Sequence, residues 1–90
     1  MGNFFPNGAL KSIENWKDGK LNGKYVIYQE NGLKVMQTSY INGSDNGEYF
    51  LYHENGNLQV QGYFKNGIPI GTWKYYHPDG KLKGKAIYPD

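Results

Sequence analysis

The sequence predicts an all-β fold: an antiparallel β-meander of about four repeated hairpins, in a single twisted sheet or an open half-barrel. Three observations lead to this prediction. Turn signals recur every 24 residues, thirteen glycines and nine tyrosines are far more than an average domain of 90 residues carries, and no segment places apolar residues at helical spacing. Glycine and aromatic residues in this proportion are typical of short strands joined by tight turns.

The repeat defines the organisation of the chain. Glu-Asn-Gly at 54–56 recurs as Glu-Asn-Gly at 30–32 and as Pro-Asp-Gly at 78–80, and aromatic residues recur in the same register. A single hairpin leaves its apolar face in water, so copies lying side by side are expected to form one continuous sheet. The result is a single domain, residues 1–90, with units at about 1–24, 25–48, 49–72 and 73–90.

The first turn of each unit suits a three-residue hairpin loop, a type I turn followed by glycine at positive φ. Pro6 and Pro78 favour this loop over a two-residue turn, because proline has no N–H to give to a strand pair while its fixed φ fits the first loop position. The second turn, Asp-Gly or Asn-Gly, is expected to use the same chemistry. The turn glycines are Gly8, Gly32, Gly56 and Gly80 in the first position and Gly19, Gly43 and Gly67 in the second.

These turns predict strands at 9–17, 23–29, 33–41, 47–53, 57–65, 71–77 and 81–88, with a short strand at 2–5. In the third unit, Tyr52 is expected to pair with Leu58 and Phe50 with Val60. One face of this hairpin then carries Phe50, Tyr52, Leu58 and Val60, and the other Tyr49, Leu51, Gln59 and Gln61. A slip of one residue exchanges the two sets.

Composition narrows the class of protein. Without cysteine the chain has neither disulfides nor a thiolate metal site. A net charge of +2, with signs alternating along the chain, argues against a nucleic-acid mimic or a strongly basic phosphate binder, so nucleic acid is an unlikely partner. Neither a secretory signal nor an apolar run of roughly 20 residues is present, so a cytoplasmic location is expected.

The chain lacks a convincing catalytic constellation, so we expect a non-enzyme with no metal and no cofactor. His53 and His77 occupy the same position beside the first turn of adjacent units, where solvent-facing strand ends are expected. A small hydrolase or metal enzyme that uses these two histidines stays open as an alternative.

The aromatic columns are the candidate binding surface. One row is Tyr25, Tyr49 and Trp73, and a second is Tyr28, Tyr52 and Tyr76. Both rows are expected to form the core of a thin protein, or one row lines a curved surface open to a partner, as tyrosine and tryptophan do in binding hot spots.

The last strand carries alternating lysines at positions 81, 83 and 85, followed by Pro89. Lysine and proline on an edge strand discourage pairing with other chains, and this is the preferred interpretation. A small basic patch for anionic lipid or nucleic acid is the alternative. A monomer or a weak homodimer is expected.

Two stretches, YFLYHENGNLQVQGYFKNGIPIG (49–71) and WKYYHPDGKLKGKAIY (73–88), resemble the bacterial variant of the MORN repeat. The resemblance implies a bacterial or phage protein-binding module, since proteins with this variant are commonly described as antitoxins and better-known MORN proteins are scaffolds for proteins or acidic phospholipids. We therefore expect an antitoxin-like or inhibitor protein that neutralises or scaffolds a partner protein, such as a toxin or other conflict effector, through an aromatic sheet face. Binding of acidic phospholipid at a membrane surface is the alternative. Lys34 departs from the pattern, because the other units have leucine there.

Overall fold

The computed structural model describes residues 2–90; Met1, the first residue of the predicted first unit, lies outside them. The described chain is all β, without a helix, which confirms the predicted fold class. Its strands are β1 (Gly2–Phe4), β2 (Leu10–Ile13), β3 (Trp16–Lys17), β4 (Lys20–Leu21), β5 (Gly23–Tyr28), β6 (Lys34–Ile41), β7 (Ser44–Asp45), β8 (Gly47–Tyr52), β9 (Leu58–Lys65), β10 (Ile68–Tyr76) and β11 (Leu82–Tyr88).

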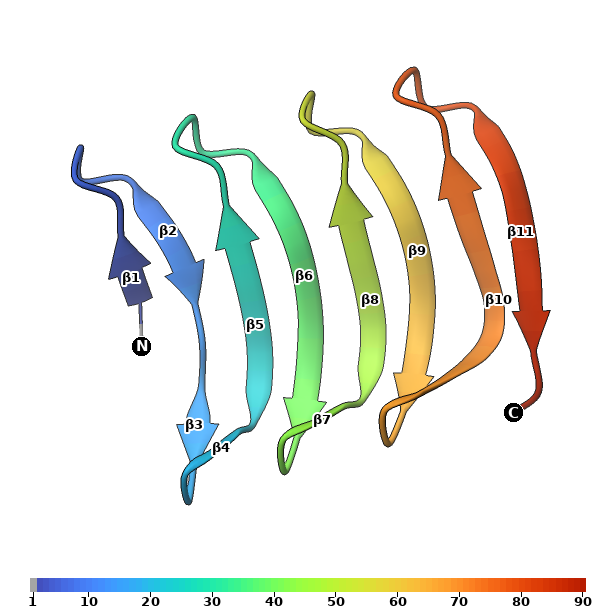
Figure 1. Cartoon of the computed structure of the whole chain (residues 1–90), viewed down its shortest axis with the longest axis horizontal. Helices are drawn as coiled ribbons and strands as arrows, with labels where there is room; N and C mark the ends of the chain where they lie inside the picture. Colours follow the sequence, from blue (N-terminus) through green and yellow to red (C-terminus); the bar gives the residue numbers. More distant parts are fainter. Residues whose placement is uncertain (1) are drawn as a thin grey trace.

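The main sheet is one open antiparallel layer in the order β1-β2-β5-β6-β8-β9-β10-β11, with β7 added beside β6 (Figure 1). Strands β3 and β4 pair with each other in a separate small sheet. The molecule measures 38 × 35 × 9 Å, so it is one sheet thick. Four main hairpins follow one another in chain order, as the repeat predicts.

Two of the predicted strands differ from the structure by more than one residue at an end. The strand predicted at 9–17 divides into β2 and β3, because Asn15 between them bonds through its side-chain Nδ2 to the Lys24 carbonyl at 3.0 Å and through its own carbonyl to the Asn22 N–H at 2.8 Å. Strand β10 begins three residues before the predicted 71, because Ile68 and Pro69 already pair with β9 across the turn.

The first turn of each unit is the predicted three-residue loop. In the third unit, the His53 N–H donates to the Asn57 carbonyl at 2.8 Å and the Gly56 N–H donates to the His53 carbonyl at 2.9 Å. Gly56 has φ 91°, a conformation that costs glycine little and other residues much. The same two bonds close the other three first turns, so the 24-residue repeat holds in atomic detail.

The second turns do not share this chemistry, and that prediction is wrong. Asn42 and Gly43 both have positive φ, 49° and 83°, and the flanking residues Ile41 and Ser44 pair directly. This is a two-residue type I′ turn, whose twist matches that of the strands it joins. Asn and Asp are the residues besides glycine that tolerate the left-handed conformation, and the turns at 18–19 and 66–67 use the same device.

Each hairpin contains a β-bulge that corrects the predicted register. Tyr52 pairs with Leu58 as expected, but Leu51 pairs with Val60 and Phe50 with Gln61. Gln59 is therefore an extra residue on β9, and residues 11, 35 and 83 are its equivalents in the other hairpins. Since paired residues share a face, the predicted placement of Val60 with Phe50, and of Gln61 with Tyr49, is wrong. The bulge at residue 83 also interrupts the alternation predicted for the three lysines of the last strand.

Neighbouring units are also joined turn to turn. The Gly43 N–H donates to the Leu21 carbonyl of the preceding second turn at 2.8 Å, and Gly67 bonds Asp45 in the same way. Among the first turns, the Asn55 side chain donates to the Pro78 carbonyl at 2.8 Å. Neighbouring repeats are thus joined at one or both ends of their strands as well as along them.

Candidate functional site

The two faces of the sheet are differently built. The ladder face is defined by six aromatic rings that contact one another in two groups: Tyr25 with Tyr40, and Tyr49, Phe64, Trp73 and Tyr88. Ring centroids lie 5.0 Å apart between Phe64 and Trp73 and 5.6 Å apart between Tyr49 and Trp73. Such pairs add to stability beyond the area they bury.

Trp73 is the anchor of the ladder face. Its side chain is 7% exposed, and its indole Nε1 donates to the Ile70 carbonyl at 3.2 Å. The ring lies flat on Gly62, where a Cβ would come within 2.2 Å of the indole carbon Cδ2. Each first-strand ring of the ladder face has a small residue as its partner on the neighbouring strand. Thr38 pairs with Tyr25, Gly62 with Tyr49 and Ala86 with Trp73.

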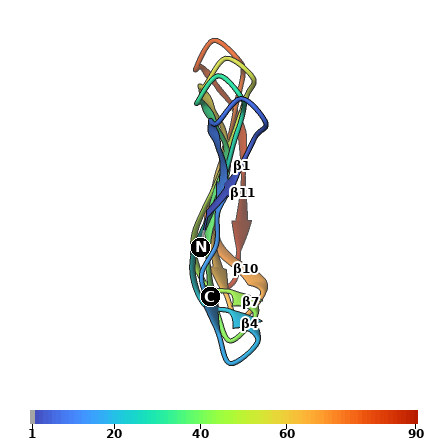
Figure 2. The ribbon, with the colours of Figure 1, turned by 90° about the vertical axis from the view of Figure 1, so that its left-hand side faces the viewer.

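The second turns overhang the ladder face. Figure 2 shows β4, β7 and the start of β10 projecting to one side of the thin ribbon. On that side Asp45 of β7 accepts a hydrogen bond from the hydroxyl of Thr38, which is 2% exposed, at 3.0 Å. The pKa values of the Tyr40 and Tyr49 phenols are raised. Burial is the largest cause, and the negative charge of Asp45 is the second. This face is therefore the partly covered core of the protein.

The opposite side, the open face, carries a row that crosses all four main hairpins. Its members alternate between a first-strand aromatic and its paired second-strand residue: Phe4, Leu10, Tyr28, Lys34, Tyr52, Leu58, Tyr76 and Leu82. The three tyrosines are half-buried, and within residues 2–90 their rings make no contact with another ring. Burial raises the pKa of Tyr52. In the described part of the chain, no second layer covers this row.

The six predicted binding residues therefore lie on opposite faces. Tyr25, Tyr49 and Trp73 belong to the ladder face, whereas Tyr28, Tyr52 and Tyr76 belong to the open face, because residues 25 and 28 differ by an odd number of positions along one strand. The structure does not bring the two rows together.

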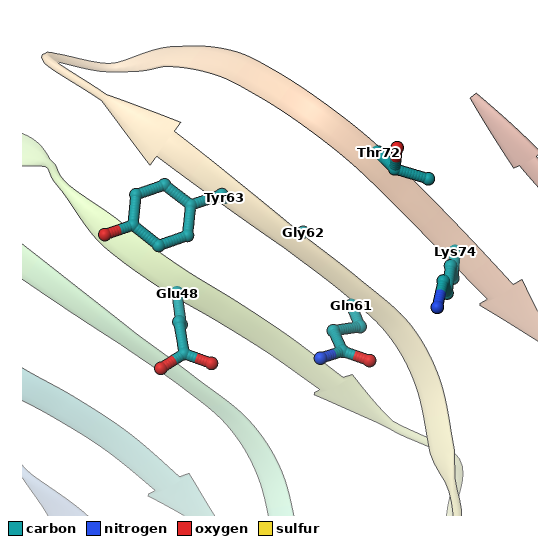
Figure 3. A pocket seen from close by; sticks show the side chains of 6 residues that line it. All are labelled: Glu48, Gln61, Gly62, Tyr63, Thr72 and Lys74. Carbon is teal, nitrogen blue, oxygen red and sulfur yellow. The ribbon is translucent and has the colours of Figure 1, made fainter. Parts of the chain in front are cut away.

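A shallow hollow lies on the open face over β8, β9 and β10 (Figure 3). It holds about 260 Å³ and has the backbone of Gly62 in its floor. Figure 3 shows the surrounding side chains from three adjacent strands, and they are Glu48, Gln61, Tyr63, Thr72 and Lys74. The hollow offers hydrogen-bond donors and one carboxylate.

Lys74 pairs directly with Lys85 of β11 on the open face, beside the hollow. The sequence-based register did not predict this pair. Without the bulge at residue 83, Lys74 pairs with Gly84 instead. Only the position of the bulge would have identified the Lys74–Lys85 pair. The bulge recurs every 24 residues, but no particular residue type marks it.

The two histidines do not form a site. His53 donates from Nε2 to the Tyr76 carbonyl at 2.8 Å and so joins the third unit to the fourth, whereas His77 is exposed. Among residues 2–90, no three His, Cys, Asp or Glu side chains come together as a metal site.

The last two units of the chain match a known protein family. Residues 45–66 and 69–88 match the family model of the MORN repeat variant. These matches support a MORN-repeat protein. The matched stretches correspond to β7–β9 and to β10–β11, which contain the hollow and the buried Trp73. No curated protein and no solved structure matches the chain.

MORN repeats are in general protein- or membrane-binding modules, and the family is in general non-catalytic. Among residues 2–90 there is no helical segment with the length and apolarity that a membrane crossing requires. For a chain with these two matches, binding of a macromolecule is the function to consider, and the two sheet faces are the candidate surfaces.

Proposed function

We propose that this chain is a non-enzymatic protein-binding module whose open face docks a partner protein. The observation that carries the proposal is the uncovered row of Tyr28, Tyr52 and Tyr76. Among residues 2–90 these rings belong to no aromatic cluster. The ladder rings instead pack on one another, and Trp73 and Thr38 of that face hydrogen-bond to Ile70 and Asp45 of the second turns. Tyrosine combines a large contact area with a polar tip, and such residues dominate binding energy at interfaces.

The biological role we propose is that of an antitoxin-like or inhibitor protein that neutralises or scaffolds its partner. Its support is the resemblance of residues 49–71 and 73–88 to the variant repeat of that class. A thin ribbon with one packed and one unoccupied face suits this role, because it covers a broad surface of another protein without a catalytic site of its own.

Photo-crosslinking tests which face is used. p-Benzoylphenylalanine is placed at Tyr52 of the open face or at Tyr49 of the ladder face, and the full chain is expressed in its native host. We expect one protein to be crosslinked from position 52 and not from position 49. Equal crosslinking from both positions would contradict the proposal.

The captured protein is then purified and its affinity measured for Tyr52→Ala and, as a ladder-face control, Tyr49→Phe. We expect Tyr52→Ala to weaken binding at least tenfold, the size of a hot-spot residue, while the folded fraction stays unchanged. Binding lost only in proportion to unfolding would remove the claim. A toxic partner would be recognised by growth that the wild-type chain rescues and the Tyr52→Ala variant does not.

A further inference from the structure

We propose that the hollow on the open face is a docking site for an acidic side chain of the partner protein, held by Lys74 and Lys85. The inference rests on the proposed function and names the partner's chemistry: an exposed Asp or Glu on a protein surface. Three features of the described residues support it.

The first feature is an unneutralised pair of like charges. Lys74 and Lys85 lie directly opposite each other on β10 and β11. Within residues 2–90 neither ammonium group has a hydrogen bond or an ion pair. Like charges directly opposite on one sheet face destabilise it. A carboxylate that binds to both ammonium groups offsets this repulsion. Its binding free energy is therefore more favourable here than at an isolated lysine.

The second feature is the set of donors in the hollow. The Gln61 amide pairs across from Lys74, and the Thr72 hydroxyl lies on the same strand two residues away. Figure 3 shows both groups on the same side of the sheet as the Lys74 amine. An ionised carboxylate only accepts hydrogen bonds, so donors of these three kinds match it.

The third feature is the border of the hollow. Tyr63 is 46% exposed and Ile87, which pairs with Thr72, is 74% exposed. Apolar contacts around a polar centre exclude water from it and are typical of protein interfaces. Glu48 lies at the β8 side of the hollow and repels an anion there, which directs the carboxylate towards β10 and β11. One carboxylate within the hollow and a net charge of only +2 also argue for a single acidic side chain rather than a continuous anionic surface.

The first experiment measures this site without the natural partner. A blocked hexaglutamate peptide is titrated into the ¹⁵N-labelled full chain at low salt, with hexaglutamine as the control peptide. We expect saturable shifts of the Gln61 side-chain amide and of the Thr72 and Lys74 backbone amides. Lys74→Gln and Lys85→Gln should each weaken binding about two- to fivefold, as for exposed ion pairs.

Two matched variants test whether the effect on peptide affinity is specific to the hollow. Lys24→Gln removes a lysine of the same face that pairs with Ser39, away from the hollow, and should leave the affinity unchanged. Glu48→Gln removes the repelling carboxylate and should strengthen binding about twofold. Equal weakening by Lys24→Gln and Lys74→Gln, or shifts spread over all lysines, would overturn the proposal. It would also be overturned by vesicles with 30% phosphatidylserine binding more tightly than the peptide, regardless of which lysine is removed.

A second readout needs no ligand. If the lysine pair is repulsive, Lys85→Gln should raise the melting temperature by about 1–5 °C at low salt, an increase that fades in 0.5 M NaCl, whereas Lys24→Gln should not. An unchanged melting temperature for Lys85→Gln would remove the first feature and overturn the proposal.

The two proposals fail separately. If Tyr52→Ala abolishes partner binding and Lys74→Gln does not weaken it, the open face binds the partner and the acidic docking site is wrong. If hexaglutamate binds at the hollow and no protein is crosslinked from position 52, the site stands and the proposed function is wrong.

Discussion

The ladder face and the open face carry similar numbers of aromatic residues but organise them differently. On the ladder face, rings from both strands of a hairpin meet, because each first-strand ring lies beside a small residue such as Gly62. On the open face, each tyrosine is paired instead with a long side chain such as Leu58, which keeps the rings apart. The residue opposite a ring, rather than the ring itself, thus decides whether an aromatic row becomes core or surface.

The largest contrast is expected from truncating one ring on each face. Trp73→Ala should lower the free energy of unfolding by about 3–5 kcal/mol, because it removes the most buried ring and leaves a cavity. Tyr76→Ala should lower it by about 1–2 kcal/mol, because the ring is only half-buried and contacts no other ring of the described residues. Urea unfolding followed by circular dichroism measures both, and equal losses would show that the two faces are energetically alike.

A smaller effect is expected from adding a methyl group under the ladder. Gly62→Ala should destabilise the protein by about 2–3 kcal/mol, since the new Cβ overlaps the Trp73 indole unless the ring moves. Gly84→Ala is the matched control, because it lies in a strand, has ordinary φ and has open space around its Cβ position. That change should be neutral or stabilise by up to about 1 kcal/mol. A tolerated Gly62→Ala would mean that the indole does not need this platform.

The smallest expected effect is electrostatic. The pKa values of Tyr40 and Tyr49 are raised in the folded state, so the protein binds more protons folded than unfolded at high pH. Their contribution to stability is fully present below the unfolded pKa of about 10 and is lost as the pH rises through the folded pKa.

Asp45→Asn should lower the pKa of Tyr40 and Tyr49 and leave that of Tyr52 unchanged, because burial alone raises the latter. Tyrosine ring signals followed by NMR between pH 8 and pH 12 would show the difference. A shift of all three tyrosines by the same amount would contradict the separation of the faces.

Much of the fold follows from sequence because the first turns are locally encoded. Gly56 and its equivalents require positive φ, Pro78 fits only one loop position, and the 24-residue spacing then fixes four hairpins. The second turns differ from the prediction because Asn42 adopts a left-handed conformation, which the predicted loop requires only of glycine. Local chemistry permits both turn types there, and strand twist decides between them.

The candidate site could be predicted only in part. The rows that contain Tyr49 and Tyr52 follow from aromatic residues that recur every 24 positions. The strand register beyond each first turn does not follow from sequence, because the extra residue at 59 or 83 resembles any other strand residue. The hollow and the pairing of Lys74 with Lys85 depend on that extra residue. They arise from the backbone hydrogen-bond pattern of the assembled sheet, which no local signal specifies.

The bulge also has a consequence for how such a chain can change in length. Gain or loss of one residue between a first turn and its bulge inverts the inward and outward sets of that strand, whereas gain or loss of a whole 24-residue unit preserves every pairing. Length variation in this architecture is therefore expected in whole modules, and the breadth of the surface offered to another molecule grows in equal steps.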